Sequence, residues 1–582
     1  MMSFRRRAFV LVLLCVVLGA VALALVTRVR RSPKTPASRA LLVYDVPSSI
    51  EESQPSFGTF SLASFRPERP TLFDITAGLR RAAEDDHVRG LVLHVGDVEW
   101  GWARVAEFRE ALGEFRASGK PIYASLDGGG EQSYLIAASA DHLAMPPTAQ
   151  LGLDGLSLTA TFLKGTYDKL GIRPNFAHVG AFKSAVEQYT RESLSPDARR
   201  ALDALLDDSF ACLVDSIASA RGLARDSVLA LVDRGPHPAA AAFTAGLVDT
   251  LLHQADLDSL AARAVSKKPL HPQKLIRYLE SPELGDPGSS SIALIAVEGT
   301  IMPGRDRDDP FGGRTLGSES LCDALRKAGK LDRVKAVVLR VDSPGGSGQA
   351  SDDVWREVRR LRRSKPVVVS MSNLAASGGY YIACGADAIV AQPTTITGSI
   401  GVFGGKLNIL GLYQKLGLQV ETLTRGKQAD MMSPYRDFSA SEAVQFQQQM
   451  DAFYRTFLSR VSEGRGMPEA AVDSVAQGRV WSGRAALELG LVDSLGGLSA
   501  AVSMARVRAH IPEGETVKLE PFPERHGPFF RQAFRSLLDE DEDDTARTML
   551  ARLPEGVASW LRASSFPTGA VLALMPFTLE LR

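Results

Sequence analysis

Cysteine and histidine are scarce in this chain of 582 residues. Its 4 Cys include no Cys-x-x-Cys pair, which excludes a disulfide-built scaffold and argues against a thiolate zinc site. Its 9 His include no His-Glu-x-x-His motif, and none lies between Ser290 and Ala509. Any catalytic serine in that stretch would therefore lack a nearby histidine base in its own part of the sequence.

An excess of charge of either sign is also missing, because 67 Lys and Arg balance 67 Asp and Glu. A general nucleic-acid binder is usually basic, so the composition argues against nucleic acid as a partner. The apolar content of 45% and the charged content of 23% are typical of a globular protein. At roughly 150 residues per domain, the length predicts two to four domains.

The long run without charge, Ala8 to Thr27, lies between basic clusters at the N-terminus. About 20 residues span the roughly 30 Å hydrocarbon core, so residues 1–30 are predicted to hold one transmembrane helix. A cleaved signal peptide is the alternative, but its apolar region is usually about 7–15 residues long. A lipoprotein site at Cys15 is disfavoured by the large Leu14 before it. Basic residues flank both ends, so the positive-inside rule does not give the orientation.

An internal repeat organises the rest of the chain. A shift of 246 residues places Tyr134 on Tyr380 and Gly180 on Gly426, and the match needs no gap over about fifty residues. The chain therefore holds two copies of one unit. The predicted division is an anchor (1–30), a first repeat (40–265), a linker rich in Pro, Gly and Ser (266–290), a second repeat (291–505) and a tail (506–582).

Each copy is predicted to have an α/β fold. In the second copy, Ser291–Ile301, Val334–Asp342 and Pro366–Met371 are short β-branched runs typical of buried strands, and a helical pattern separates the last two. Tyr380–Ala386 is rich in small residues and predicts a packed helix. The strand–helix–strand order predicts parallel pairing with right-handed crossovers.

Two glycine turns follow two of these strands. Residues 342–346 read Asp-Ser-Pro-Gly-Gly, and residues 375–379 read Ala-Ala-Ser-Gly-Gly. Glycines of this kind let backbone N–H groups face a ligand. Ser377 would begin a helix at the carboxyl-end side of the sheet, where ligands bind in open α/β sheets. The alternative is that Ser377 is an ordinary N-cap and the glycines form tight turns, and these two turns alone leave both readings open.

With Thr-Gly-Ser-Ile-Gly at 397–401, these turns resemble the motifs of the signal peptide peptidase A family of serine peptidases. The resemblance covers about residues 40–505. It implies two tandem repeats with a fold like that of the Clp protease subunit and the crotonases, preceded by one transmembrane helix. It also implies a homotetramer at the bacterial inner membrane, with the catalytic body on the periplasmic side. Short apolar peptides such as signal peptide remnants are the implied substrates, and no metal or organic cofactor is implied.

By this resemblance, Ser377 is the nucleophile and a neutral lysine is its base. Short family members carry that lysine just before an Asp-hydrophobic-Met-Ser-Pro stretch, which here starts at Asp430 and follows Ala429. The 246-residue shift takes Ala429 to Lys183 and Ser377 to Glu131. The first copy has thus kept the lysine and lost the serine, and the second copy has done the reverse. This complementary loss predicts a composite site with Lys183 as the general base.

Two alternatives concern the lysine. Lys427, two positions off register, is the rival base, and an exposed surface lysine is the ordinary fate of a residue such as Lys183. A free lysine has a pKa near 10.4, and a catalytic base needs a value of about 7–8, which desolvation can supply. We therefore expect Lys183 to be buried where the halves or neighbouring protomers meet. By the resemblance, Ser399 orients its amine.

The tetrahedral intermediate of such a reaction needs hydrogen-bond donors for its oxyanion. The N–H groups of Gly346 and Gly378 are the expected donors, with Gly345 as a third. Two other functions fit parts of the pattern. A crotonase-like acyl-CoA enzyme could use the same glycines, and a catalytically inactive scaffold could bind peptides without cleaving them.

Overall fold

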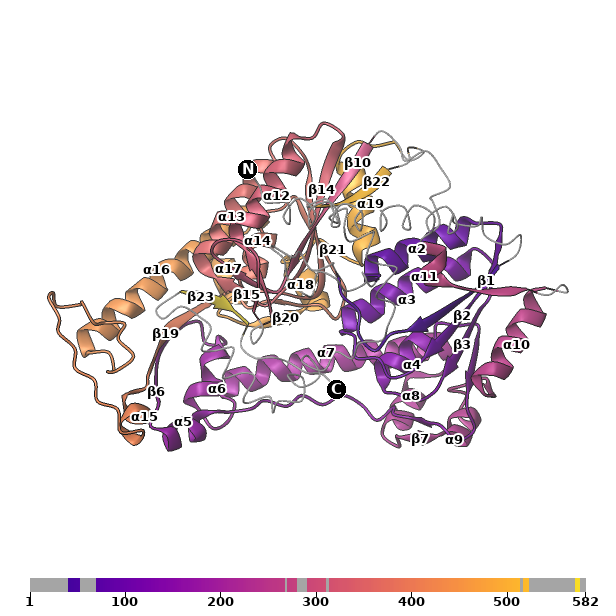
Figure 1. Ribbon diagram of the computed structural model, residues 1–582, viewed down its shortest axis with the longest axis horizontal. Helices are drawn as coiled ribbons and strands as arrows, with labels where there is room; N and C mark the ends of the chain where they lie inside the picture. The colour runs from indigo at the N-terminus through magenta and orange to yellow at the C-terminus, as the bar shows by residue number, and fades with distance from the viewer. Residues whose placement is uncertain are drawn as a thin grey trace, which may run out of the picture.

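Parallel β-sheet lies at the centre of each repeat in the computed structural model (Figure 1). The predicted anchor over 1–30 and much of the linker and tail lie outside the described residues. Among the residues that are described, none of the helices combines the length and apolar character needed to cross a membrane. The structure describes residues 40–52, 70–266, 270–279, 290–309, 313–512, 515, 517–522 and 571–575.

The first repeat is built on a parallel sheet whose central strands are buried on both faces. Leu42 and Tyr44 pack on one face against α2 and α3, and Leu41 and Val43 pack on the other face against α10. Burying one such side chain stabilises the fold by about 1.5–3 kcal/mol. In sheet order the strands are β8 (Thr250–Leu251), β4 (His142–Met145), β3 (Ile122–Leu126), β2 (Val88–Val95), β1 (Ala40–Val46) and β9 (His271–Lys274). The helices are α2 (Leu72–Glu84), α3 (Trp102–Ala117), α4 (Glu131–Ala137), α5 (Lys164–Leu170), α6 (Glu187–Thr190), α7 (Pro196–Arg221), α8 (Arg225–Val232), α9 (Ala239–Thr244), α10 (Gln254–Val265) and α11 (Leu275–Leu279).

The second repeat has a matching sheet, in which the predicted strands pair in parallel as expected. The main path runs β20 (Val480–Ser482), β18 (Ile396–Gly398), β16 (Val367–Ala376), β14 (Val334–Ser343), β10 (Ser290–Glu298) and β22 (Val517–Phe522), with β17 (Ala388–Ala391) and β21 (Ser494–Leu495) beside β16. The helices are α12 (Ser318–Lys330), α13 (Gly348–Leu361), α14 (Gly378–Ala383), α15 (Leu410–Lys415), α16 (Ala440–Arg465), α17 (Glu469–Val475), α18 (Gly483–Glu488) and α19 (Leu498–Arg508).

The internal repeat is visible in equivalent buried contacts. The Tyr134 hydroxyl donates to the Leu247 carbonyl at 2.8 Å, and the Tyr380 hydroxyl donates to the Leu491 carbonyl at 2.9 Å. One predicted strand is divided, because Gly299 adopts φ 96° and turns the chain between β10 and β11 (Thr300–Met302). The prediction of one continuous strand from 291 to 301 was therefore wrong at Gly299. Glycine adopts this left-handed backbone conformation without the steric cost that other residues have.

A third sheet joins the two repeats. Its member from the first repeat is β6 (Arg173–Val179), which pairs antiparallel with β19 (Val402–Asn408) of the second repeat from Val179 opposite Val402 to Arg173 opposite Asn408. Figure 1 shows this pair in the arm at the left, beneath α16. The full order is β12 (Arg307–Asp309), β13 (Gly313–Gly317), β11, β15 (Gly345–Ser347), β23 (Leu572–Leu574), β19 and β6. A separate small ladder pairs β5 (Gln150–Leu151) with β7 (His237–Pro238).

Candidate active site

Ser377 lies between the end of β16 and the start of α14, in a sharp turn. Its backbone has φ 54° and ψ −112°, which is a strained conformation for a residue other than glycine. Its side chain makes no capping hydrogen bond to α14, and the residue is completely buried. Ser377 thus occupies the N-cap position of α14 without capping the helix through its hydroxyl, so the alternative of an ordinary N-cap serine is wrong.

The β6–β19 pairing brings Lys183 to the same place. Val179 ends β6 opposite Val402, and four residues later the chain reaches Lys183, while Ser399 lies just before β19. The amine of Lys183 is 2.8 Å from the Ser377 hydroxyl, 3.0 Å from the Ser399 carbonyl and 3.0 Å from the Ser399 hydroxyl. Lysine and serine thus come from different repeats of one chain and meet inside it.

Burial sets the protonation state of Lys183. Its exposed fraction is 1%, and desolvation lowers the pKa of its amine well below the ordinary lysine value. The three oxygen partners of the amine belong to two serines and carry no charge. A neutral amine has two N–H donors and one lone pair, so it can donate both protons to Ser399 while its lone pair accepts the Ser377 proton.

The rival base Lys427 and the repeat counterparts of Lys183 and Ser377, which are Ala429 and Glu131, lie outside this site. Lys427 and Ala429 lie in an exposed stretch of the second repeat. In the first repeat, Glu131 begins α4 at the position of the missing serine. Its carboxylate accepts the N–H groups of Asp154 at 3.1 Å and Gly155 at 2.9 Å, so this glutamate is a structural residue of its own repeat.

The two glycine turns lie against each other beside Ser377. A methyl group built on Gly378 would lie 3.1 Å from the nitrogen of Gly346, so the two backbones are in close contact. Gly378 is the first residue of α14, where an N–H has no partner within the helix. The Gly345 N–H donates to the Ser343 hydroxyl at 3.2 Å. Gly378 is therefore better placed than Gly345 to donate to an external oxygen, whereas Gly346 lies opposite Ala573 in the β15–β23 ladder.

A short segment near the end of the chain lies along the first glycine turn. Strand β23 pairs antiparallel with β15, with Ala573 opposite Gly346. The Gly348 N–H donates to the Val571 carbonyl at 3.0 Å, and the Met575 N–H donates to the Pro344 carbonyl at 2.8 Å. On its other edge, β23 pairs with β19. An extended segment of this chain thus fills a strand position between the glycine turn and β19.

Apolar side chains flank that position. Leu572 packs with Ala185, Val186 and Phe403. Met575 belongs to another cluster, which holds Ala201, Leu205 and Val480 together with the partly buried Phe182 and Ile396. Phe182, Ala185 and Val186 lie within three positions of Lys183 in the sequence. The side chains on both flanks of this strand position are therefore largely apolar.

Sequence analysis missed one glycine that Lys183 requires. Gly478 has φ 77°, and a methyl group there would lie 2.5 Å from the Cβ of Lys183. Nothing in the local sequence indicates this approach, because 295 positions separate the two residues. Among the described residues, no cluster of three or more His, Cys, Asp or Glu could hold a metal ion. The functional groups gathered at this site are the Lys183 amine, the Ser377 hydroxyl and backbone N–H groups of the glycine turns.

A family model matches a segment of each repeat. The family model "Peptidase family S49" matches residues 114–267 and 359–511, one segment in each repeat. The chain belongs to peptidase family S49. Its two repeats of mixed α/β sheet are consistent with the expected fold of the Clp protease and crotonase type. The resemblance inferred from the sequence motifs is confirmed.

Curated relatives match most of the S49 chain. "Serine protease SPPA, chloroplastic" of Arabidopsis thaliana is 34% identical over 446 residues, which are 75% of this chain and 66% of that protein. "Protease 4" of Salmonella typhi is 31% identical over 519 residues, which are 87% of this chain and 81% of that protein. "Protease 4" of Haemophilus influenzae is 32% identical over 455 residues, with coverage of 75% and 73%. The similarity therefore extends through both repeats.

Proposed function

We propose that this protein is a membrane-anchored serine endopeptidase that uses Ser377 as nucleophile and Lys183 as general base. Its substrates are cleaved signal peptides and other short apolar peptides. The observation that carries the proposal is the buried contact of 2.8 Å between the Lys183 amine and the Ser377 hydroxyl. Membership of peptidase family S49 supports the reaction class.

The proposed reaction has two halves, acylation of Ser377 and hydrolysis of the acyl-enzyme. Neutral Lys183 takes the hydroxyl proton as Ser377 Oγ attacks the peptide carbonyl carbon. The oxyanion that forms accepts hydrogen bonds from the N–H groups of Gly346 and Gly378. Lys183 then gives its proton to the leaving amine, the C–N bond breaks and an acyl-serine ester remains. In the second half, Lys183 takes a proton from water as the water oxygen attacks the ester carbon; the bond from that carbon to Ser377 Oγ then breaks, Lys183 returns the proton to Oγ, and the peptide leaves with a new carboxyl group. Ser399 orients the amine throughout.

The substrate binds as a β-strand in this proposal. Strand β23 supports this, since its backbone pairs with the glycine turn and its Leu572 side chain packs against apolar residues. Main-chain pairing would hold many sequences in one register, and apolar contacts would select hydrophobic ones. A peptide released from a membrane is rich in hydrophobic residues and would therefore be selected.

The location of the enzyme rests on the sequence. The apolar run Ala8 to Thr27 supports a single-pass anchor in the bacterial inner membrane, with the catalytic body on the periplasmic side. Such an anchor would keep the site close to membrane-derived peptides. Alkaline carbonate extraction of membranes tests this arrangement. The full chain should stay in the membrane fraction, and a chain lacking residues 1–30 should be released.

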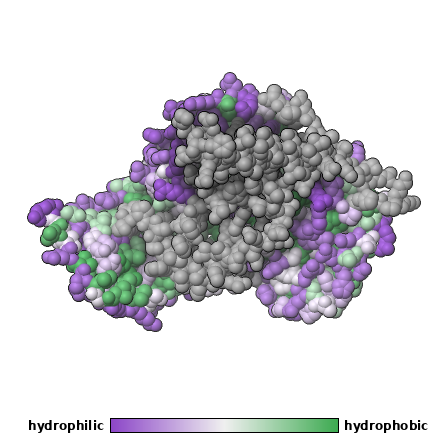
Figure 2. All heavy atoms as spheres, viewed as in Figure 1, coloured by the Kyte–Doolittle hydropathy of each residue, from purple (hydrophilic) through white to green (hydrophobic). Residues whose placement is uncertain are grey.

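Self-association is also part of the proposal, as a homotetramer. The repeat shift places the counterpart of β6 at 419–425, which forms no strand and exposes Leu423 to 87%. Leu416 and Leu418 nearby are exposed to 66% and 47%. Figure 2 shows hydrophobic residues gathered at this end of the molecule. The counterpart of β19 is 156–162, so a second copy could offer that segment to 419–425.

A Leu423→Asp chain is expected to sediment at a lower mass, and an unchanged mass would contradict this contact.

The function is tested by hydrolysis of a Leu-rich peptide. The wild-type chain is expected to cleave it, and Ser377→Ala is expected to abolish cleavage without lowering the midpoint of thermal unfolding. No cleavage by the wild-type protein would support the inactive scaffold. Equal cleavage by both proteins would place the nucleophile elsewhere.

Strand β23 must leave before a substrate strand can use β15. Removal of residues 571–582 is therefore expected to lower KM by about tenfold with little change in kcat, because a competing internal segment is gone. Leu572→Asp in the full chain should act in the same direction. A synthetic Val-Leu-Ala-Leu-Met peptide should inhibit the truncated enzyme competitively. If truncation leaves KM unchanged or raises it, β23 does not occupy the substrate position.

A further inference from the structure

Strand β16 contains an irregularity just before Ser377. Along β14 and β16, Val341 pairs with Met371, but the next pair is Ser343 with Ala375. Residues 372–374 of β16 thus lie opposite the single residue Asp342. Bulges of this kind bend a strand and re-aim the side chains that follow. Here the residues that follow are Ala375, Ala376 and Ser377, so the bulge sets where the nucleophile lies relative to the glycine turn after Asp342.

Each residue of the bulge has a polar partner. The Leu374 N–H donates to the Asp342 carboxylate at 3.0 Å, and the Ser372 hydroxyl donates to the carboxylate of Glu52 from the first repeat. The Asn373 side-chain oxygen accepts the backbone N–H groups of Ala103 at 3.1 Å and Arg104 at 3.2 Å. The last two N–H groups belong to the first turn of α3, so Asn373 caps a helix of the other repeat.

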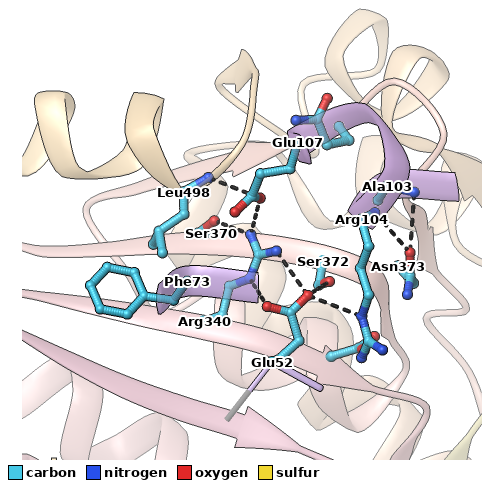
Figure 3. A network of polar contacts seen from close by, with 12 residues as sticks. Glu52, Phe73, Ala103, Arg104, Glu107, Arg340, Ser370, Ser372, Asn373 and Leu498 are labelled. Carbon is cyan, nitrogen blue, oxygen red and sulfur yellow. Dashed lines mark hydrogen bonds and ion pairs between the residues drawn. The ribbon is translucent and has the colours of Figure 1, made fainter. Parts of the chain in front are cut away.

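Arg104 connects both sides of the bulge. Its guanidinium contacts Asp342 of β14 at 2.5 Å and Glu52 at 3.1 Å. Figure 3 shows Arg104 and Arg340 on either side of Glu52. Arg340 in turn contacts Glu52 at 2.9 Å and Glu107 of α3 at 2.9 Å. The carboxylates that face the two guanidiniums come from the first repeat, from the turn that carries Gly346 and from Glu298 at the end of β10, which lies 3.7 Å from Arg104.

Arg340, Glu52 and Glu107 are almost completely withdrawn from water, whereas the side chains of Arg104 and Asp342 are 16% and 13% exposed. Arg340 is exposed to 3% and Glu52 to 7%. Desolvation of such groups offsets most of their mutual attraction, so a buried network of this kind adds little net stability. What it does specify is geometry, since each guanidinium and carboxylate has directional partners. Burial raises the pKa of Asp342 to about 6, so its pair with Arg104 is intact at neutral and alkaline pH.

We propose that α3 of the first repeat positions the nucleophile of the second repeat, with Arg104 and Asn373 holding the 372–374 bulge against Asp342. The first repeat thus contributes a positioning helix in addition to Lys183. The kinetic part of this inference rests on the proposed peptidase function. Arg104 contacts the Asp342 carboxylate that accepts the Leu374 N–H, and Asn373 ties the bulge to α3. Neither residue contacts Ser377 in this account, so both are positioning residues.

The test compares matched variants of the full chain. Arg104→Ala and Asn373→Ala are expected to lower kcat for the Leu-rich peptide by about 10–100-fold with KM within about twofold, because a misplaced nucleophile costs turnover more than binding. Asn373→Asp keeps the accepting oxygen and should keep kcat near the wild-type value. Arg109→Ala, on the same helix, removes a contact to Ser139 within the first repeat and should leave kcat unchanged. Hydrogen exchange at the Leu374 amide should be at least about tenfold faster in the two alanine variants only.

The outcomes separate this inference from the proposed function. If the wild-type protein cleaves no peptide, the proposed function fails, and the exchange rate at Leu374 still decides the positioning role. If Arg104→Ala does not fold, the Asn373→Ala and Asn373→Asp pair gives the answer. Wild-type kcat and wild-type exchange at Leu374 in folded Asn373→Ala would overturn the inference. Equal loss of kcat in Arg109→Ala would show a general effect of α3 and would overturn it as well.

Discussion

Replacing Lys183 by alanine is expected to lower kcat by at least about 10⁴-fold, with the same loss in Ser377→Ala and in the double variant. The losses should not add, because the amine and the hydroxyl act as one unit through a single contact of 2.8 Å. Steady-state hydrolysis of the Leu-rich peptide measures the three values. Lys427→Ala is the matched control, since this lysine is exposed and should leave kcat unchanged.

The same lysine predicts the pH profile. Only the neutral amine can accept the proton of Ser377, and desolvation lowers the pKa of Lys183 well below its ordinary value. Activity should therefore rise with pH along one limb whose midpoint lies below the ordinary lysine pKa, and fall as the amine is protonated at lower pH. A limb centred on the ordinary lysine value would contradict a buried base.

Burial of Lys183 costs folding stability even though catalysis needs it. Because the folded chain binds the Lys183 proton more weakly than the unfolded chain, this cost is largest below the lowered pKa and fades as the pH rises to the ordinary lysine value. Lys183→Met removes that cost and is expected to unfold at or above the wild-type temperature while remaining inactive. An inactive variant that also unfolds early would leave Lys183 with a structural role only.

The complementary loss of Ser and Lys is the feature that made the site predictable. The family resemblance gave the role of Ser377 and the position of the missing lysine, and a linear comparison of the two repeats then carried that position to the first repeat, because equivalent positions in a duplicated fold have equivalent places in space. Ala429 identified Lys183, and Glu131 showed that the first repeat has no serine of its own. Burial of Lys183 followed from the chemistry that a neutral lysine requires, and its 1% exposure agrees with that expectation.

The parts that sequence did not predict depend on contacts between distant segments. The β6–β19 ladder joins strands more than 220 positions apart, and both strands are short and partly polar, so neither has a clear buried-strand pattern. The bulge at 372–374 reads as a continuous strand until its partners Glu52 and Arg104 are seen. The pairing of β23 with β15 is invisible locally, because a short apolar segment has many potential partners.

Gly378→Ala is expected to lower kcat by about 10²–10³-fold, which is the usual effect of losing an oxyanion donor. The added methyl group would lie 2.6 Å from the Ser351 hydroxyl, 3.1 Å from the Gly345 Cα and 3.1 Å from the Gly346 nitrogen. The Ser351 side chain can rotate, but the two glycine positions are backbone and must move. The Gly346 N–H would then no longer point at the oxygen of the intermediate.

Kinetics can distinguish this displacement from a loss of substrate binding. KM should change little, because a substrate strand would pair along β15 in either protein, whereas the oxyanion exists only during the reaction. Gly113→Ala is the matched control, since a methyl group there meets nothing within 4 Å and alanine is the better helix former. A Gly378→Ala enzyme with wild-type kcat would show that the oxyanion is held by other groups than these two glycines.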